Sequence, residues 1–187
     1  MEYKAKCGDI FLCDSDRVAA KMVKFLMQSP TIYQQIWCWI THRLEPVRYY
    51  HAGLILDENK MIEQQSQVQY GDTQKILSRR IIIYRKKTLT YQQRLDLGQA
   101  AITDLGEKYG ILSVIGKALT WFTGIVWFED MMHIGDMDIC INRVAYWYYK
   151  SNEELFGLSN FKRNTTKLMD KYCSHYTDEW EIVYQNE

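Results

Sequence analysis

The sequence is poor in proline and has no surplus of either charge sign. Its 187 residues include two prolines, and 23 lysines and arginines balance 23 aspartates and glutamates. This balance argues against a nucleic-acid partner, because proteins that neutralise phosphates usually carry a basic surplus. We find no Pro- or Ser-rich linker, repeat or low-complexity stretch. The length and composition therefore predict one domain over residues 1–187.

The chain also lacks a cysteine framework. Its five cysteines are odd in number and irregularly spaced, and no CxxC pair suggests a zinc knuckle or a redox dithiol. We therefore expect no metal and no cofactor, and at least one unpaired thiol. Residues 2–6 are mostly polar, with no apolar stretch typical of a secretory signal. The expected compartment is a reducing cytosol.

Apolar residues are plentiful, since 47% of the chain is hydrophobic and 14% is aromatic. A core of this size needs no disulfide or metal to hold it. The longest apolar run, residues 111–128 (ILSVIGKALTWFTGIVWF), has about the minimum length for a membrane span. A buried or groove-lining helix and an interfacial membrane contact remain open for it. A true span is disfavoured because Lys117 lies near its middle.

Hydrophobic periodicity and turn residues predict the order of the elements. Thr90 and Gln93 form a capping box that opens one of the helices. Residues 31–48 and 121–135 are expected to be aromatic insertions. The first packs over a groove or a partner, or else forms a plain core helix. Strands are expected at residues 8–12, 47–56, 61–68, 81–85 and 180–184, with a hairpin turn at 57–60, and helices at residues 15–26, 90–109, 111–123 and 140–148.

Three residues are suited to nucleophilic chemistry. Cys140 is the one cysteine placed at the start of a predicted helix, where backbone N–H groups and the helix dipole stabilise a thiolate. His51 lies in a predicted strand, which fixes the direction of its ring, and is the best candidate base among the four histidines. Glu63 lies across the predicted hairpin, where a carboxylate can orient the imidazole.

Each of these residues also has a structural interpretation. A cysteine at a helix start is more often a small buried hydrophobic residue. A strand histidine is often a core or surface residue with no chemical role, and a lone glutamate on a strand is usually solvated. From the residues alone, the catalytic and structural interpretations of Cys140, His51 and Glu63 remain balanced.

Four motifs in order resemble a known family. They are residues 8–12 (GDIFL), residues 50–55 (YHAGLI), residues 61–63 (MIE) and residues 139–140 (IC) opening a helix. This series resembles the circularly permuted NlpC-type papain-like hydrolases, the YiiX-like branch, whose superfamily includes lecithin retinol acyltransferase. Residues 109–110 (YG) and 178–183 (DEWEIV) also look like family features.

The resemblance implies an α+β, permuted papain-like fold with a small antiparallel sheet packed against helices. It implies a thiol hydrolase in which Cys140 attacks the carbonyl carbon, His51 transfers the proton and Glu63 orients the His51 ring. The implied substrate is a peptide, isopeptide or cell-wall amide, or an acyl ester. Tyr50 and Ile141 stand where relatives often carry serine, so the pocket is expected to differ. The alternatives are a non-catalytic binding module on the same fold and a lipid acyltransferase or thioesterase at a membrane surface.

Overall fold

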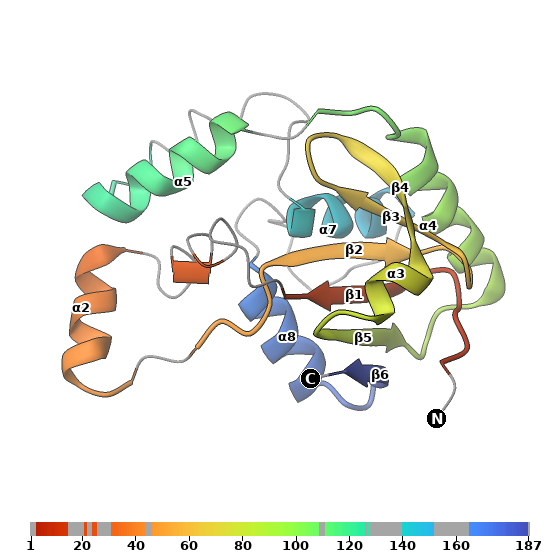
Figure 1. The fold of residues 1–187 in the computed structure, drawn as a ribbon, viewed down its shortest axis with the longest axis horizontal. Helices are drawn as coiled ribbons and strands as arrows, with labels where there is room; N and C mark the ends of the chain where they lie inside the picture. The colour runs from red at the N-terminus through yellow and green to blue at the C-terminus, as the bar shows by residue number, and fades with distance from the viewer. Residues whose placement is uncertain are drawn as a thin grey trace.

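The protein is built around one six-stranded antiparallel sheet, seen in a computed structural model (Figure 1). The structure describes residues 3–14, 21, 24–25, 31–43, 46–108, 111–125, 127, 140–151 and 165–186. The strands have the order β4-β3-β2-β1-β5-β6, and every neighbouring pair is antiparallel. Their bounds are β1 Asp9–Cys13, β2 His51–Ile55, β3 Lys60–Gln64, β4 Val68–Asp72, β5 Ile81–Lys86 and β6 Trp180–Asn186.

Helices of the described residues join and cover these strands, which makes the fold α+β. Three of them, α4, α7 and α8, pack their apolar side chains on one face of the sheet, and the short α3 packs on the other. The helix bounds are α2 Ile32–Ile40, α3 Thr73–Leu77, α4 Tyr91–Thr103, α5 Ile111–Thr123, α7 Cys140–Lys150 and α8 Thr166–His175. None of the helices in the described residues is long and apolar enough to cross a bilayer.

Alternation along the central strand divides the core into two layers. Ile10 and Leu12 of β1 face the cluster formed with α4, α7 and α8, whereas Phe11 and Cys13 face the opposite layer. All four side chains are fully buried. Since the side-chain period of a strand is two, β1 contributes side chains to both layers.

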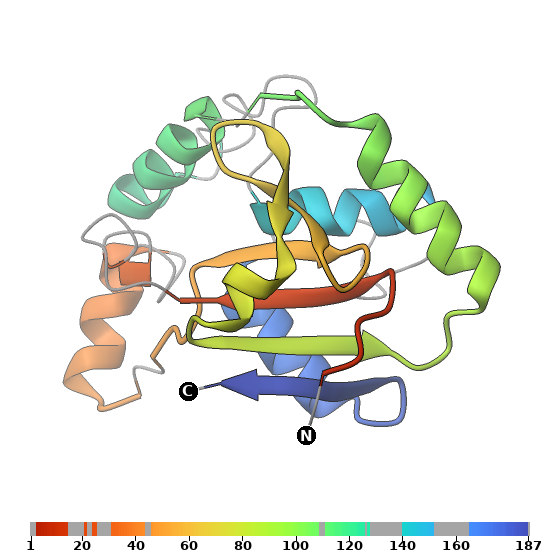
Figure 2. The same cartoon turned by 45° about the vertical axis from the view of Figure 1, so that its right-hand side comes forward.

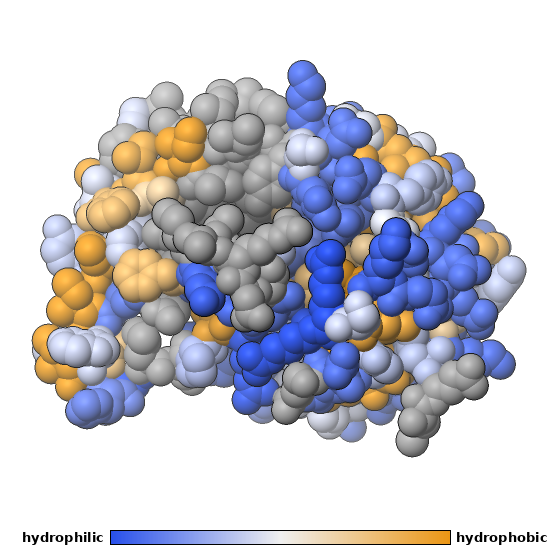
Figure 3. All heavy atoms as spheres, viewed as in Figure 1, coloured by the Kyte–Doolittle hydropathy of each residue, from blue (hydrophilic) through white to orange (hydrophobic). Residues whose placement is uncertain are grey.

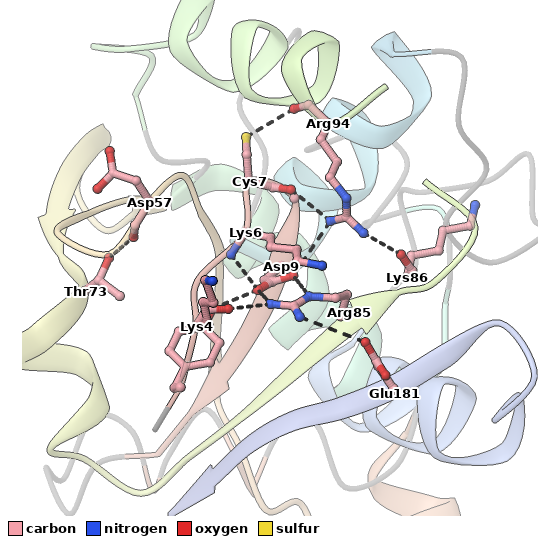
Figure 4. A network of polar contacts seen from close by, with 12 residues as sticks. Lys4, Lys6, Cys7, Asp9, Asp57, Thr73, Arg85, Lys86, Arg94 and Glu181 are labelled. Carbon is pink, nitrogen blue, oxygen red and sulfur yellow. Dashed lines mark hydrogen bonds and ion pairs between the residues drawn. The ribbon is translucent and has the colours of Figure 1, made fainter. Parts of the chain in front are cut away.

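A buried ion pair anchors the N-terminal end of β1, at Asp9. Asp9 is fully buried, and its carboxylate accepts hydrogen bonds from Arg85 of β5 at 2.8 and 2.6 Å. Arg94 of α4 lies 3.8 Å from the same carboxylate and donates to the carbonyls of Cys7 and Lys86 (Figure 4). The aspartate of the GD motif therefore ties the N-terminal segment, β5 and α4 together.

Most elements expected from the sequence are present. The strands at β1, β5 and β6, the helix α5, and the capping box of Thr90 and Gln93 on α4 are confirmed. Most residues of the helix expected at 15–26 lie outside the described residues, as does most of the insertion 121–135 beyond α5.

Three expectations about the bounds of elements were wrong, and the helices α3 and α8 were not predicted. The helix predicted over residues 90–109 ends at Thr103. The strand predicted over residues 61–68 is interrupted by a turn after Gln64 and continues as a separate strand, β4. The strand predicted to begin at Val47 begins at His51. Thr165 caps α8 by accepting a hydrogen bond from the Leu168 backbone. Leu168, Met169, Tyr172 and Cys173 recur at helical spacing in α8, so the signal was present in the sequence and was missed.

Candidate active site

His51 begins β2 at a place where one edge of the strand is open. On one side, β2 pairs with β1, and His51 lies opposite Cys13. On the other side, the ladder with β3 begins only at Gly53, opposite Glu63. The sheet therefore leaves His51 and Ala52 without a β3 partner, and the helix α7 packs against β2.

The β2–β3 hairpin sets the position of the carboxylate. Gly53 and Glu63 are cross-strand partners, so Glu63 is a diagonal neighbour of His51 on the same face. The Glu63 Oε2 atom lies 2.8 Å from His51 Nε2, and Gln65 Nε2 donates to Glu63 Oε1 at 2.7 Å. Both carboxylate oxygens are thus occupied, which fixes the plane of the carboxylate against the ring.

Gln65 was missed in the sequence analysis, although a signal for it exists. It follows Glu63 by two residues, and in extended backbone such residues lie on one face. A glutamine at that spacing can hold the carboxylate that orients a histidine.

Cys140 completes the group from the other side of the ring. It is the first residue of α7, and its side chain is hydrogen-bonded to the His51 side chain. Glu63 occupies Nε2 of His51, which leaves Nδ1 as the ring nitrogen available to the thiol. Backbone hydrogen bonds from Ala52 and Ile141 also reach the sulfur. The structure therefore brings together the three residues selected from the sequence, in the order thiol, imidazole, carboxylate.

The three groups shift one another's ionisation. Burial alone would lower the pKa of His51, but hydrogen bonds to Cys140 and Glu63 outweigh it and raise the pKa to about 9. Burial alone would raise the pKa of Cys140, but the His51 contact and the backbone hydrogen bonds lower it overall. The pKa of Glu63 is lowered in the same way, against burial, by His51 and Gln65. All three shifts favour a thiolate beside an imidazolium that a carboxylate holds.

All five cysteines are free, but they differ in environment. Burial raises the pKa of the Cys13 and Cys173 thiols, and it raises that of Cys7 as well. Among the cysteines with a shifted pKa, Cys140 alone moves toward the thiolate. A reactive thiolate is therefore expected at Cys140 and not at Cys7, Cys13 or Cys173.

Gly53 allows an aromatic ring to lie beside the site. A Cβ at this position would meet the Phe11 ring at 2.5 Å and the Ile62 carbonyl oxygen at 2.6 Å. The Phe11 and His51 rings are 6.1 Å apart between centroids. The glycine of the YHAGLI motif thus makes room for Phe11, which covers the sheet next to the imidazole.

Comparisons with known proteins support the fold. No protein-family model and no curated protein matches the sequence. Among solved structures, the chain is similar to the metalloprotein YiiX of Escherichia coli O157:H7, with a TM-score of 0.54 and 17% identity. The similarity covers 96% of this chain and 89% of YiiX. At this identity the likeness shows a YiiX-like fold and carries no activity with it.

The residues of the site do not fit a metal ion. Within the part of the chain that the structure describes, no three His, Cys, Asp or Glu side chains are grouped so that they could hold one. The Glu63 carboxylate and His51 Nε2 are hydrogen-bonded to each other at 2.8 Å, so these two donors are engaged with one another.

Proposed function

We propose that this protein is a thiol hydrolase of the permuted papain-like, NlpC-type kind, which cleaves an amide or an acyl ester. Cys140 is the nucleophile, His51 is the general base and acid, and Glu63 is the positioning residue. The observation that carries the proposal is the buried contact series from Cys140 through His51 to Glu63, in which Cys140 is shifted toward the thiolate. Such a series is the arrangement that activates a cysteine nucleophile.

The proposed reaction has two steps. The Cys140 thiolate attacks the carbonyl carbon, and the C–N or C–O bond breaks as the His51 imidazolium gives its proton to the leaving group. A thioester and a neutral imidazole remain. Water then attacks the thioester while His51 takes its proton, and the acid leaves as the thiolate and imidazolium re-form. The Cys140 backbone N–H contributes to holding the oxyanion.

The proposed role of Glu63 is to hold one tautomer and one ring orientation. Its contact with His51 Nε2 keeps a proton on that nitrogen and leaves Nδ1 to exchange a proton with the sulfur. Gln65 keeps the carboxylate in the plane it needs. This is the division of roles found in cysteine and serine triads, where a third group orients the base and stabilises its charged form.

An acyl-transfer assay with p-nitrophenyl acetate tests the proposal. The wild-type protein is expected to release nitrophenolate and to carry an acetyl group on Cys140, detected by mass spectrometry of peptides. Cys140→Ala should lose both signals, and Cys173→Ala, which removes a buried thiol far along the chain, should keep them. Acetylation that is unchanged in Cys140→Ala, or a folded wild type that is never acetylated, would contradict the hydrolase and favour the non-catalytic binding module.

A further inference from the structure

A buried carboxylate at the end of α4 holds the helix that carries Cys140. Asp104 is the C-cap of α4 and is 6% exposed. Its Oδ2 atom accepts hydrogen bonds from Arg143 Nη1 at 3.1 Å and from the indole N–H of Trp147 at 2.9 Å. Its Oδ1 atom accepts a hydrogen bond from Lys150 Nζ at 2.9 Å. All three donors lie on α7, and we refer to these four side chains as the Asp104 network.

The spacing of the donors lets one carboxylate contact a whole face of α7. Arg143, Trp147 and Lys150 are separated by four and three residues, so they lie one above the other on the helix. Figure 2 shows α4 and α7 on the same side of the sheet, and the two helices are in contact. The network therefore joins the end of α4 to nearly the full length of α7.

Two of these charges oppose the dipoles of their own helices. Asp104 is an anion at the C-terminal end of α4, where the helix already has a partial negative charge. Arg143 is a cation at the fourth residue of α7, close to its positive end, and it is 1% exposed. Each charge is unfavourable where it stands unless the other is present, because a buried charge needs a partner. The two residues are therefore matched to each other.

Hydrogen bonds set the position of α7 more narrowly than its apolar contacts do. Ile141 and Val144 bury α7 in the core, but the hydrophobic effect has no direction, so it restrains sliding and rotation of the helix only weakly. A hydrogen bond depends on both distance and angle. Three such bonds on one face of α7 restrain its rotation and its position along its own axis.

The restraint lies close to the nucleophile. Arg143 is three residues from Cys140, which is about 4.5 Å along the helix axis. The Cys140 side chain is hydrogen-bonded to His51, which belongs to β2 and does not move with α7. A small shift of α7 therefore changes the geometry of that hydrogen bond directly.

We propose that Asp104 positions the nucleophile: by holding α7 at three points of one face, it keeps Cys140 beside His51. Asp104 is a positioning residue, since it acts through α7 and not on a substrate. The inference rests on the proposed function for the role of Cys140, but its test measures the thiol itself and needs no hydrolysis.

The test is the pH dependence of Cys140 alkylation by iodoacetamide in the full chain. A Cys38→Ser background removes the partly exposed thiol of α2. Asp104→Asn keeps the shape of the side chain but puts an amide N–H₂ where one oxygen accepted a hydrogen bond from α7. We expect the midpoint of the rate to rise by about 1 pH unit, because the thiolate loses part of a charge-assisted hydrogen bond to His51.

The direction of the shift separates position from charge. Asp104→Asn removes a negative charge and leaves the Arg143 cation without its partner. Acting through the electric field alone, both changes would stabilise a nearby thiolate and lower the pKa of Cys140. A rise therefore reports that the thiol has moved relative to the imidazole.

A neutral substitution provides a second variant. Trp147→Phe removes one donor of the Asp104 network, keeps an aromatic ring in the core and changes no charge. It should raise the midpoint in the same direction as Asp104→Asn, by a smaller amount. Because Trp147 is two turns from Cys140, it does not contact the thiol itself.

The matched control removes a carboxylate that holds a different helix. Asp170 of α8 accepts a hydrogen bond of 2.6 Å from the Tyr84 hydroxyl of β5. Asp170→Asn should lower the thermal midpoint and leave the alkylation midpoint of Cys140 unchanged. In Figure 3 apolar side chains gather at the left of the molecule, over α2 and α5, and α4 lies on the opposite side. The substitutions leave that apolar surface unaltered, so association through it does not confuse the comparison.

Two results would overturn the positioning role. One is a folded Asp104→Asn protein, checked by circular dichroism, whose Cys140 midpoint is unchanged or lowered. The other is an equal rise in Asp170→Asn, which would trace the effect to general loosening of the fold. If Asp104→Asn does not fold, an unchanged midpoint in Trp147→Phe is decisive against the role. A wild type that p-nitrophenyl acetate never acetylates would contradict the hydrolase, whereas a raised midpoint in Asp104→Asn would still support the positioning of Cys140.

Discussion

Replacing Glu63 with glutamine removes a charge from the candidate site while keeping its shape. The amide oxygen can still accept a hydrogen bond from His51 Nε2, which in the wild type lies 2.8 Å from the carboxylate. What is lost is the stabilisation of the imidazolium by a neighbouring negative charge. Because the imidazolium in turn stabilises the Cys140 thiolate, the substitution should raise the pKa of Cys140.

The size of the change follows from the hydrogen bond that is altered. A hydrogen bond to a charged group contributes about 1.5–3 kcal/mol, and a neutral one about 0.5–1.5 kcal/mol. The difference of about 1–1.5 kcal/mol should lower the pKa of His51 by about 1. The pKa of Cys140 should rise by up to the same amount. In His51→Ala the imidazolium is absent and burial, the largest influence, is opposed only by the backbone hydrogen bonds from Ala52 and Ile141, so the pKa of Cys140 should rise further than in Glu63→Gln.

The rate of Cys140 alkylation by iodoacetamide, measured from acid to alkaline pH, reports the thiolate directly. Cys38 on α2 is partly exposed, so a Cys38→Ser background leaves a cleaner signal, with the buried Cys13 and Cys173 as unreactive internal references. The midpoint of the rate should be lowest in the wild type, higher in Glu63→Gln and highest in His51→Ala. Equal midpoints in the first two, or a wild-type midpoint at the ordinary thiol value, would refute the reasoning.

Three further predictions concern stability. The lowered pKa of Glu63 adds stability above pH 4.5, and the raised pKa of its histidine partner adds stability below pH 6.5 that is lost as the pH rises through about 9. Urea titrations should therefore find the largest cost of Glu63→Gln near pH 5–6 and a smaller one above pH 9, and a cost independent of pH would count against this. Gly53→Ala places a methyl group 2.5 Å from a buried phenylalanine ring and should cost about 1–3 kcal/mol in the same assay. Asp9→Ala removes the buried partner of Arg85 and should lower the free energy of unfolding by about 3–5 kcal/mol. Glu181 is half exposed and lies 4.0 Å from the same guanidinium, so Glu181→Gln should lower it by less than about 1 kcal/mol.

The parts of the site that the sequence predicted depend on short-range signals. Glu63 lies twelve residues from His51 because a hairpin joins their strands, and the turn residues between them mark that hairpin. The aspartate Asp57 makes the turn by accepting hydrogen bonds from the backbone of Asn59 and Lys60 at 2.8 Å. A turn signal of this kind specifies that Glu63 lies beside His51, and it involves no residue far along the chain.

The orientation of α2 could not be predicted in this way. The apolar residues Tyr33, Ile36, Trp37 and Ile40 recur at helical spacing, a period that by itself would place them in the core, but all four are at least 50% exposed. The contact that turns them outward joins Gln35 to Trp121, far along the chain. Likewise, the end of the strand at Gln64 depends on how β4 returns to pair with β3. Both features arise from partners that a local pattern does not specify.

The two contacts of His51 differ in what maintains them. The contact with Glu63 lies within one hairpin, whose register places the two side chains on one face of the sheet. The contact with Cys140 depends on how α7 packs along β2, through Ile141 and Val144 in the core beneath it. A hairpin restores its own register, whereas a helix can shift as a body when its core side chains change. Substitutions in the core of α7 should therefore disturb the nucleophile before they disturb the base, and the pKa of Cys140 is the more sensitive measure of an intact site.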